Sequence, residues 1–331
     1  SGWSTVLQAL FHSTLQTIKI SIATLISSVA KFAVGISLLF AGLDFIGIML
    51  GYLTAYLLLD AFLLLFVIRY FADNNIRPGR SMLMIRRPLL ADVLRSGLSV
   101  WVPNALRVAG EKIGVLGVYA VASSAGAGLY FIAFSMALVV ISIPQSVLAL
   151  LLPVLSGMSE GRKRMMDQAL RLSLAVTTPL ALMFVIYPGT FLSIIGSEYV
   201  EASDSLAILA LSALVAPIVA AYTSYVLALG KNIHVLAIGI ALSASQLALS
   251  FILIPQMGDT GAAIAFTSGY YLSIAAVMFS ARKIGHKFNS IEMLKVVSIP
   301  IGLTGLLYAF DVSWIIGIPI LLLVSLISYT R

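Results

Sequence analysis

The sequence predicts an all-α polytopic membrane protein with about ten transmembrane helices. The first observation behind this fold class is the composition. Of the 331 residues, 60% are hydrophobic and 10% are charged, and the mean hydropathy is +1.07. A soluble domain of this size would have more apolar surface than it could bury. The solvent around most of the chain must therefore be lipid.

The second observation is a series of long apolar stretches. A hydrocarbon core about 30 Å thick needs roughly 20 apolar residues of helix to cross it. We expect helices because an open strand edge would leave backbone groups unsatisfied in lipid. The predicted spans are residues 20–40, 46–68, 98–121, 126–152, 168–187, 205–229, 234–254, 260–281, 294–310 and 313–329.

The third observation is the distribution of charge among the loops. Outside the apolar stretches, Lys and Arg fall in every second loop. These basic loops contain His12 and Lys19; Arg69, Arg77, Arg80, Arg86, Arg87 and Arg95; Arg162, Lys163, Arg164 and Arg171; Lys231; Arg282, Lys283, Lys287 and Lys295; and Arg331. The loops between them contain Asp44; no charge at 123–126; Glu198, Glu201 and Asp204; Asp259; and Asp311. The positive-inside rule places the basic loops and both ends of the chain in the cytoplasm.

Several functional classes are disfavoured by the same composition. The net charge of +7 comes from short loops beside spans instead of a basic stripe, so we expect no nucleic-acid partner. Anionic lipid headgroups account for the basic residues. With no cysteine and three scattered histidines, we predict no disulfide, no metal site and no cofactor. A membrane-embedded glycosyltransferase would need carboxylates in a large outer loop, and the longest here is about 188–204. We therefore expect no enzyme and no catalytic residues.

The loops also divide the chain. The longest, residues 69–97, ends in a run in which Leu90, Val93 and Leu94 lie at helical spacing opposite charged positions. This pattern is typical of a short helix in the cytoplasmic interface. We expect the segment to be a linker between lobes. The six spans of 98–281 then form one compact group, and 282–331 forms a final hairpin.

Two parts of the chain resemble each other. The matching sets are Gly42, Asp44, Gly47, Gly51 and Tyr52, and Gly258, Asp259, Gly261, Gly269 and Tyr270. Each set surrounds an acidic outer turn that leads into a helix with a Gly-Tyr pair. Parallel duplication of a lobe, as found in transporters, would produce this pattern.

An ordered series of motifs is similar to a known family. Residues 110–119, 127–134 and 150–156 resemble the seventh and eighth helices of polysaccharide flippases. Residues 195–210 and 227–258 contain further motifs of the same kind. These lipid-linked oligosaccharide flippases belong to the superfamily that also contains multidrug and toxin extrusion transporters. The resemblance extends over most of the chain.

The resemblance implies a fold of two six-helix lobes followed by two C-terminal helices. Residues 1–68 would then be the last two helices of the first lobe, 69–97 the cytoplasmic interfacial linker, 98–281 the second lobe and 282–331 the C-terminal hairpin. About four N-terminal helices would be missing, which keeps the first loop cytoplasmic. The chain also begins Ser1-Gly2-Trp3 without an initiator Met, so we expect a piece of a longer protein.

The resemblance also implies an activity. A flippase of this family would move a polyprenyl-pyrophosphate-linked oligosaccharide from the cytoplasmic to the outer leaflet by alternating access. The location would be the plasma (inner) membrane of a prokaryote, and a proton or sodium ion would couple transport to a gradient. The alternative is an ion-coupled antiporter of the sister family, which would carry multidrug-type organic cations.

Five charged residues lie well inside the predicted spans, away from their ends: Lys31, Asp60, Arg107, Glu111 and Lys112. A charge at mid-bilayer costs at least about 2.5–3.5 kcal/mol, so such residues usually face a partner or a watery cavity. On a helix, Arg107 and Glu111 share one stripe, and Lys112 is turned about 100° from Glu111. The tally of three basic to two acidic residues favours an anionic substrate over an organic cation.

We interpret Lys31, Arg107 and Lys112 as substrate-binding residues that line a cationic cavity for a pyrophosphate headgroup. The arginine guanidinium can donate two parallel hydrogen bonds to a phosphate, whereas the lysine ammonium acts as a compact positive charge. Glu111 either holds Arg107 in place or couples transport to an ion gradient. A purely structural i, i+4 pair of Arg107 and Glu111 is the alternative. Asp60 is either a second coupling residue or a neutral buried carboxyl.

Overall fold

The structure is a computed structural model, and it describes residues 17–74, 87–149, 151–158, 160–285, 290–310 and 312–330. All regular structure within these ranges is helical. The predicted linker at 69–97 is thus described only in part, and Asp311 lies outside the described residues. The chain divides into two compact units, Ser1–Leu89 and Leu90–Arg331.

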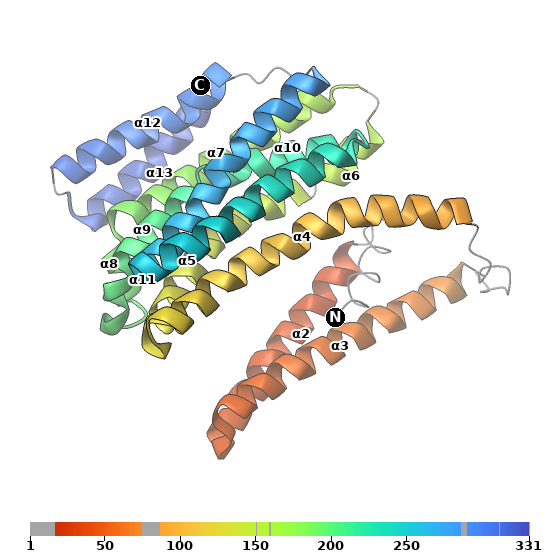
Figure 1. The fold of residues 1–331 in the computed structure, drawn as a ribbon, viewed down its shortest axis with the longest axis horizontal. Helices are drawn as coiled ribbons and strands as arrows, with labels where there is room; N and C mark the ends of the chain where they lie inside the picture. The colour runs from red at the N-terminus through yellow and green to blue at the C-terminus, as the bar shows by residue number, and fades with distance from the viewer. Residues whose placement is uncertain are drawn as a thin grey trace. The chain divides into compact units, whose positions relative to one another are not determined.

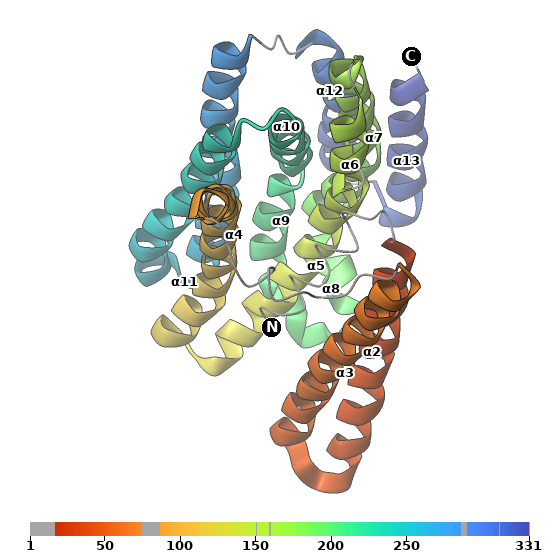
Figure 2. The ribbon, with the colours of Figure 1, turned by 90° about the vertical axis from the view of Figure 1, so that its right-hand side faces the viewer.

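Residues 17–74 of the first unit form a helical hairpin. Helix α2 (Thr17–Leu38) continues into a short π-helical turn, η1 (Leu39–Leu43), and the chain then returns as α3 (Asp44–Asp73). Gly42 makes the reversal with φ +82°, a left-handed conformation that favours glycine. The two helices lie side by side in Figures 1 and 2. The predicted spans 20–40 and 46–68 correspond to these two arms.

Glycine allows the arms of this hairpin to approach closely. A Cβ atom on Gly51 would lie 2.8 Å from the Lys31 carbonyl oxygen and 2.9 Å from Cα of Gly35. Small residues at such crossings let membrane helices pack backbone to backbone. Lys31 therefore lies at the level of Gly51 on the opposite arm.

The second unit contains the remaining helices. They are α4 (Arg87–Val121), whose first residues precede the unit boundary, α5 (Ser124–Ala149), α6 (Leu151–Gly157), α7 (Arg162–Ile186), α8 (Pro188–Ser193), η3 (Ser197–Ala202), α9 (Ser203–Ser212), α10 (Ala216–Ala228), α11 (Asn232–Ile284), α12 (Ser290–Ala309) and α13 (Trp314–Thr330). Figure 1 shows most of them running alongside one another in a bundle.

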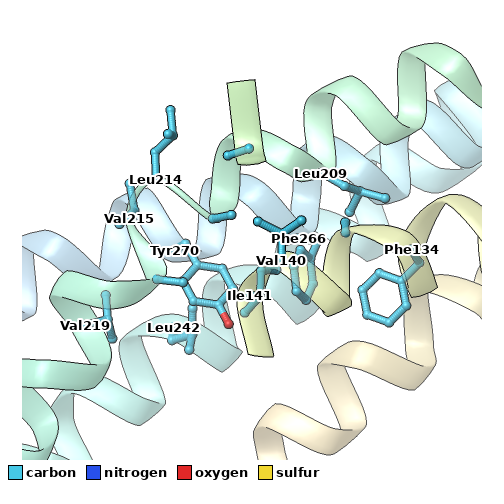
Figure 3. Close-up of a cluster of buried hydrophobic side chains, with 14 of the residues drawn as sticks. Phe134, Val140, Ile141, Leu209, Leu214, Val215, Val219, Leu242, Phe266 and Tyr270 are labelled. Atoms are coloured by element: carbon cyan, nitrogen blue, oxygen red, sulfur yellow. The ribbon is translucent and has the colours of Figure 1, made fainter. Parts of the chain in front are cut away.

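The core of the second unit lies where α5, α9, α10 and α11 meet (Figure 3). Phe134 of α5 packs edge-on against Phe266 of α11, with ring centroids 5.0 Å apart, and Phe266 in turn contacts Tyr270. Outside the core the surface is strongly apolar, for example at Phe251, which is 71% exposed. Exposed apolar side chains on this scale are expected of helices that face lipid and not water.

Helix α11 is a second hairpin, with its reversal at Gly258 (φ +60°). Its two halves correspond to the predicted spans 234–254 and 260–281. A Cβ atom on Gly269 would lie 3.0 Å from the Leu242 carbonyl oxygen. Both hairpins thus reverse at a glycine with positive φ just before an aspartate, Asp44 or Asp259, and both have a closely packed glycine in the returning arm. This is the geometry behind the internal sequence resemblance.

The C-terminal helices α12 and α13 pack against α7. Met183 of α7 forms a small apolar cluster with Leu307 and Leu321. The Tyr187 hydroxyl donates a 2.8 Å hydrogen bond to the Val312 carbonyl oxygen. The C-terminal hairpin is therefore attached to the rest of the second unit by apolar and polar contacts.

By length and composition alone, five continuous helical segments of the described chain could cross a membrane: Ile18–Asp73, Ser124–Leu148, Arg162–Ile186, Ser197–Ala228 and Asn232–Ile284. The first and the last each contain a glycine reversal and so hold two of the predicted spans. An all-α membrane protein is thus confirmed. The exact number of crossings stays a prediction.

Two predicted spans differ in detail from the helices observed. The span at 205–229 is divided into α9 and α10, because the amide groups of residues 213–215 make bonds to carbonyls three residues back and Pro217 cannot donate one. Upstream of the span at 98–121, α4 already starts at Arg87 and continues without interruption where a separate interfacial helix was expected. Pro88 lies in the first turn of α4, where its missing N–H costs little.

Candidate substrate-binding site

Lys31 lies in a pocket between α2 and α3. The pocket has a volume of about 150 Å³ and is lined by Thr24, Ser27, Ser28, Lys31, Tyr52, Ala55, Tyr56 and Leu59. The four residues of α2 recur at steps of three and four, which places them on one face of that helix. The same spacing in α3 places its four residues on the facing side. One wall of the pocket is therefore a stripe of α2, and the opposite wall is a stripe of α3.

Two aromatic rings, one from the pocket lining and one beside it, contact the Lys31 ammonium. Its Nζ atom is 4.6 Å from the Phe32 ring centroid and 4.9 Å from the Tyr52 ring centroid. Such cation–π contacts stabilise by about 0.5–1 kcal/mol when exposed and about 2 kcal/mol when desolvated. They offset only part of the cost of a cation at mid-bilayer, which is at least about 2.5 kcal/mol. An anionic ligand would offset more of it.

Hydroxyl groups form the polar part of the same pocket. Ser27 is buried, and its hydroxyl donates a 2.7 Å hydrogen bond to the Ala23 carbonyl oxygen. Because a hydroxyl that donates still has lone pairs, Ser27 can accept a further hydrogen bond from a ligand. Ser28 and Thr24 add two more hydroxyls to this wall.

Asp60 belongs to the same hairpin but not to the pocket lining. It lies on the stripe of Tyr52 and Tyr56, two turns beyond Tyr52 and so about 12 Å along the helix axis. Asp60 is half-buried, and its Oδ1 atom is inaccessible to solvent. Asp60 therefore follows the pocket-lining residues of α3, one turn beyond Tyr56. Its coupling role remains a proposal.

Three glycines of α4 define the packed face of that helix. A Cβ atom on Gly110 would lie 2.8 Å from Gln246 Oε1, one on Gly114 would lie 2.8 Å from the Tyr130 hydroxyl, and one on Gly117 would lie 2.8 Å from Ile254 Cδ1. Side chains of α5 and α11 thus occupy the space that larger residues in α4 would need. This face of α4 is closed by the second unit itself.

The charged positions of α4 lie at different angles from this glycine face. Lys112 is about 200° around the helix from Gly110 and is exposed, so it is directed away from the packed face. Glu111 is half-buried. The side chain of Arg107 lies outside the described residues, although its backbone is part of α4. The predicted Arg107–Glu111 pair therefore stays a prediction.

Gln246 occupies the junction between α4 and the α11 hairpin. Its Nε2 atom donates a 3.1 Å hydrogen bond to the Phe266 carbonyl oxygen, which joins the two arms of α11. The side chain is 1% exposed, and the described residues provide no hydrogen-bond partner for its Oε1 atom. This glutamine therefore has a clear role in helix packing.

Sequence reasoning selected Lys31 but missed the residues around it. The signal was present, because Thr24, Ser27 and Ser28 precede Lys31 at helical spacing within an apolar stretch. Tyr52 and Tyr56 are also one turn apart. What the sequence lacked was the pairing of the two stripes, which depends on the reversal at Gly42.

As for metals, the described ranges contain no group of three or more His, Cys, Asp or Glu residues that could hold an ion.

Comparison with known proteins identifies relatives. A family model described as "Polysaccharide biosynthesis protein" matches residues 1–204, which is more than half of the chain. A search of curated proteins found no match. Among solved structures, the chain resembles "Lipid II flippase MurJ, inward closed conformation", with a TM-score of 0.75 and 14% sequence identity over 99% of this chain and 70% of the other. The chain thus belongs to the family of polysaccharide biosynthesis proteins, and it has the all-α membrane fold of a flippase.

Proposed function

We propose that this protein translocates a polyprenyl-pyrophosphate-linked oligosaccharide from the cytoplasmic to the outer leaflet by alternating access. The observation on which the proposal depends is the combination of a polysaccharide-biosynthesis sequence with a flippase fold. Polysaccharide synthesis requires hydrophilic building blocks to cross a membrane, and a lipid-linked headgroup cannot cross a hydrocarbon core unaided. A flippase meets that need without catalysing a covalent step.

The proposed architecture has ten transmembrane helices in the plasma (inner) membrane of a prokaryote, with both ends of this chain cytoplasmic. Residues 1–68 are the last two helices of a first lobe, 69–97 a cytoplasmic linker, 98–281 a six-helix second lobe and 282–331 a C-terminal hairpin. The two glycine reversals support the assignment, because each lies within two residues of an aspartate of a predicted outer loop. Alternating access then requires the lobes to rock relative to each other.

Cationic side chains supply the affinity for the headgroup in this proposal. Lys31, Arg107 and Lys112 attract the anionic part of the substrate, since each is costly in lipid without a counter-charge. The exposure of Lys112 on the unpacked face of α4 supports this role. Glu111 and Asp60 are proposed to couple transport to a proton or sodium ion, or to hold a neighbouring cation in place.

A vesicle assay tests the proposal. The full-length protein is reconstituted with a fluorescent polyprenyl-pyrophosphate oligosaccharide, and a membrane-impermeant lectin measures how much glycan reaches the opposite leaflet. We expect Lys112→Gln to reduce translocation at least tenfold, because removing a charged hydrogen-bond donor costs about 1.5–3 kcal/mol. Lys283→Gln is the control, because Lys283 is a lysine at the end of α11 that packs on the Phe279 ring.

Two results would contradict the proposal. One is wild-type vesicles that show no more translocation than protein-free vesicles. The other is exchange of an organic cation such as tetraphenylphosphonium for protons without glycan movement, which would identify the antiporter instead.

A further inference from the structure

The pocket of Lys31 has the size of one ring. A cavity of about 150 Å³ is large enough for a single six-membered ring, since an engineered apolar cavity of that size binds benzene. A disaccharide would not fit. Tyr52 and Tyr56 are each about half exposed, so the pocket is accessible from the surface of the hairpin. A ring that enters it can remain linked to a longer chain outside.

The two walls of the pocket differ in chemistry. The α3 wall is mainly aromatic and apolar, with Tyr52, Tyr56 and Leu59, and the α2 wall contains the hydroxyl residues Ser27 and Ser28. A pyranose ring has a matching division, with an apolar C–H face and a rim of hydroxyl groups. Ligand sites typically combine apolar and aromatic lining with a few placed polar groups. The lining therefore suits a sugar ring better than a purely ionic ligand.

The residues that line the pocket have a single positive charge in total. Lys31 is the only charged residue among those that line it. The pocket also lies in the middle of two helices, whose backbone N–H groups are used within the helices, so it lacks the N-terminal amides that usually bind phosphate. A pyrophosphate needs several donors for its two charges. A ring with one carboxylate matches one ammonium.

We propose that this pocket binds one acidic sugar ring of the hexuronate type within the translocated glycan. The Lys31 ammonium donates to the ring carboxylate, the Ser27 and Ser28 hydroxyls bond the ring hydroxyls, and Tyr56 contacts the C–H face. This inference rests on the proposed function, because it names the part of the glycan that the first unit recognises. It narrows the proposed role of Lys31 from the headgroup as a whole to a carboxylate of the glycan, and it leaves the pyrophosphate to Arg107 and Lys112.

Binding can be measured without transport. The full-length protein, labelled with 3-fluorotyrosine and held in nanodiscs, is titrated separately with glucuronate, glucose and inorganic phosphate while the fluorine resonances of Tyr52 and Tyr56 are followed. We expect glucuronate to shift both resonances. Glucose, which lacks the carboxylate, and phosphate, which lacks the ring, should each bind at least about tenfold more weakly.

Matched variants assign the contact to Lys31. Lys31→Gln should weaken glucuronate binding at least about tenfold. Lys31→Arg keeps the charge and should retain most of it, which separates loss of binding from loss of folding. Lys283→Gln, which removes another ring-stacked lysine, should leave glucuronate binding unchanged.

Three outcomes would overturn the inference: glucose binding as tightly as glucuronate, phosphate producing the same shifts as glucuronate, or glucuronate binding that survives Lys31→Gln. These outcomes are independent of the lectin assay. Translocation by the wild type together with any of them would leave the proposed function standing without the sugar pocket. Selective glucuronate binding without translocation would support the pocket and contradict the proposed function.

Discussion

Replacing Gly51 with alanine should push α2 and α3 apart at the level of the Lys31 pocket. The new Cβ atom would lie 2.8 Å from the Lys31 carbonyl oxygen, whereas ordinary contacts begin at 3.4 Å. The two backbones must therefore separate by about 0.6 Å, and backbone atoms cannot move aside as a flexible side chain can. Overpacking of this kind typically costs about 1–3 kcal/mol.

The assay is thermal unfolding of the full-length protein in one detergent. We expect Gly51→Ala to lower the melting temperature by roughly 2–10 °C. Gly128→Ala is the matched control, because Gly128 also lies inside a helix but a Cβ atom there would meet no atom within 4 Å. That control should be neutral or stabilising by about 0.4–1 kcal/mol, as alanine restricts the unfolded chain. Equal melting temperatures for the two variants would refute the close packing of this hairpin.

Three further predictions concern topology, attachment of the C-terminal hairpin and headgroup chemistry. A single cysteine at Asp259 should be labelled from outside intact cells and one at Lys283 should not; the reverse pattern would invert the predicted orientation. Tyr187→Phe should destabilise the protein by about 0.5–1.5 kcal/mol in the same melting assay, because Val312 loses its 2.8 Å hydrogen bond, and an unchanged melting temperature would show that the bond contributes nothing. Arg107→Lys should impair translocation in the lectin assay, because a point charge cannot reproduce a bidentate grip on phosphate; full activity would remove Arg107 from the site.

The sequence by itself determined the features that depend on local composition. Lipid as solvent follows from the apolar fraction, and the helical spans follow from stretch length, since a helix satisfies its own backbone groups. The reversals at Gly42 and Gly258 were also visible, because each combines a glycine with a nearby aspartate between two apolar stretches. The break before Pro217 was not predicted, because its surroundings are as apolar as the rest of the span.

Only the tertiary structure decided which residues meet. Lys31 was selected from the sequence together with Arg107 and Lys112, but Tyr52 and Tyr56 became its neighbours only through the register of the first hairpin, at which Gly51 packs closely. Asp60 was proposed as a coupling residue or a neutral carboxyl, and it is not among the residues that line the pocket. The physical reason is that a residue's cost in lipid can be estimated from the residue type alone, whereas its partners depend on how two helices, distant in sequence, are aligned.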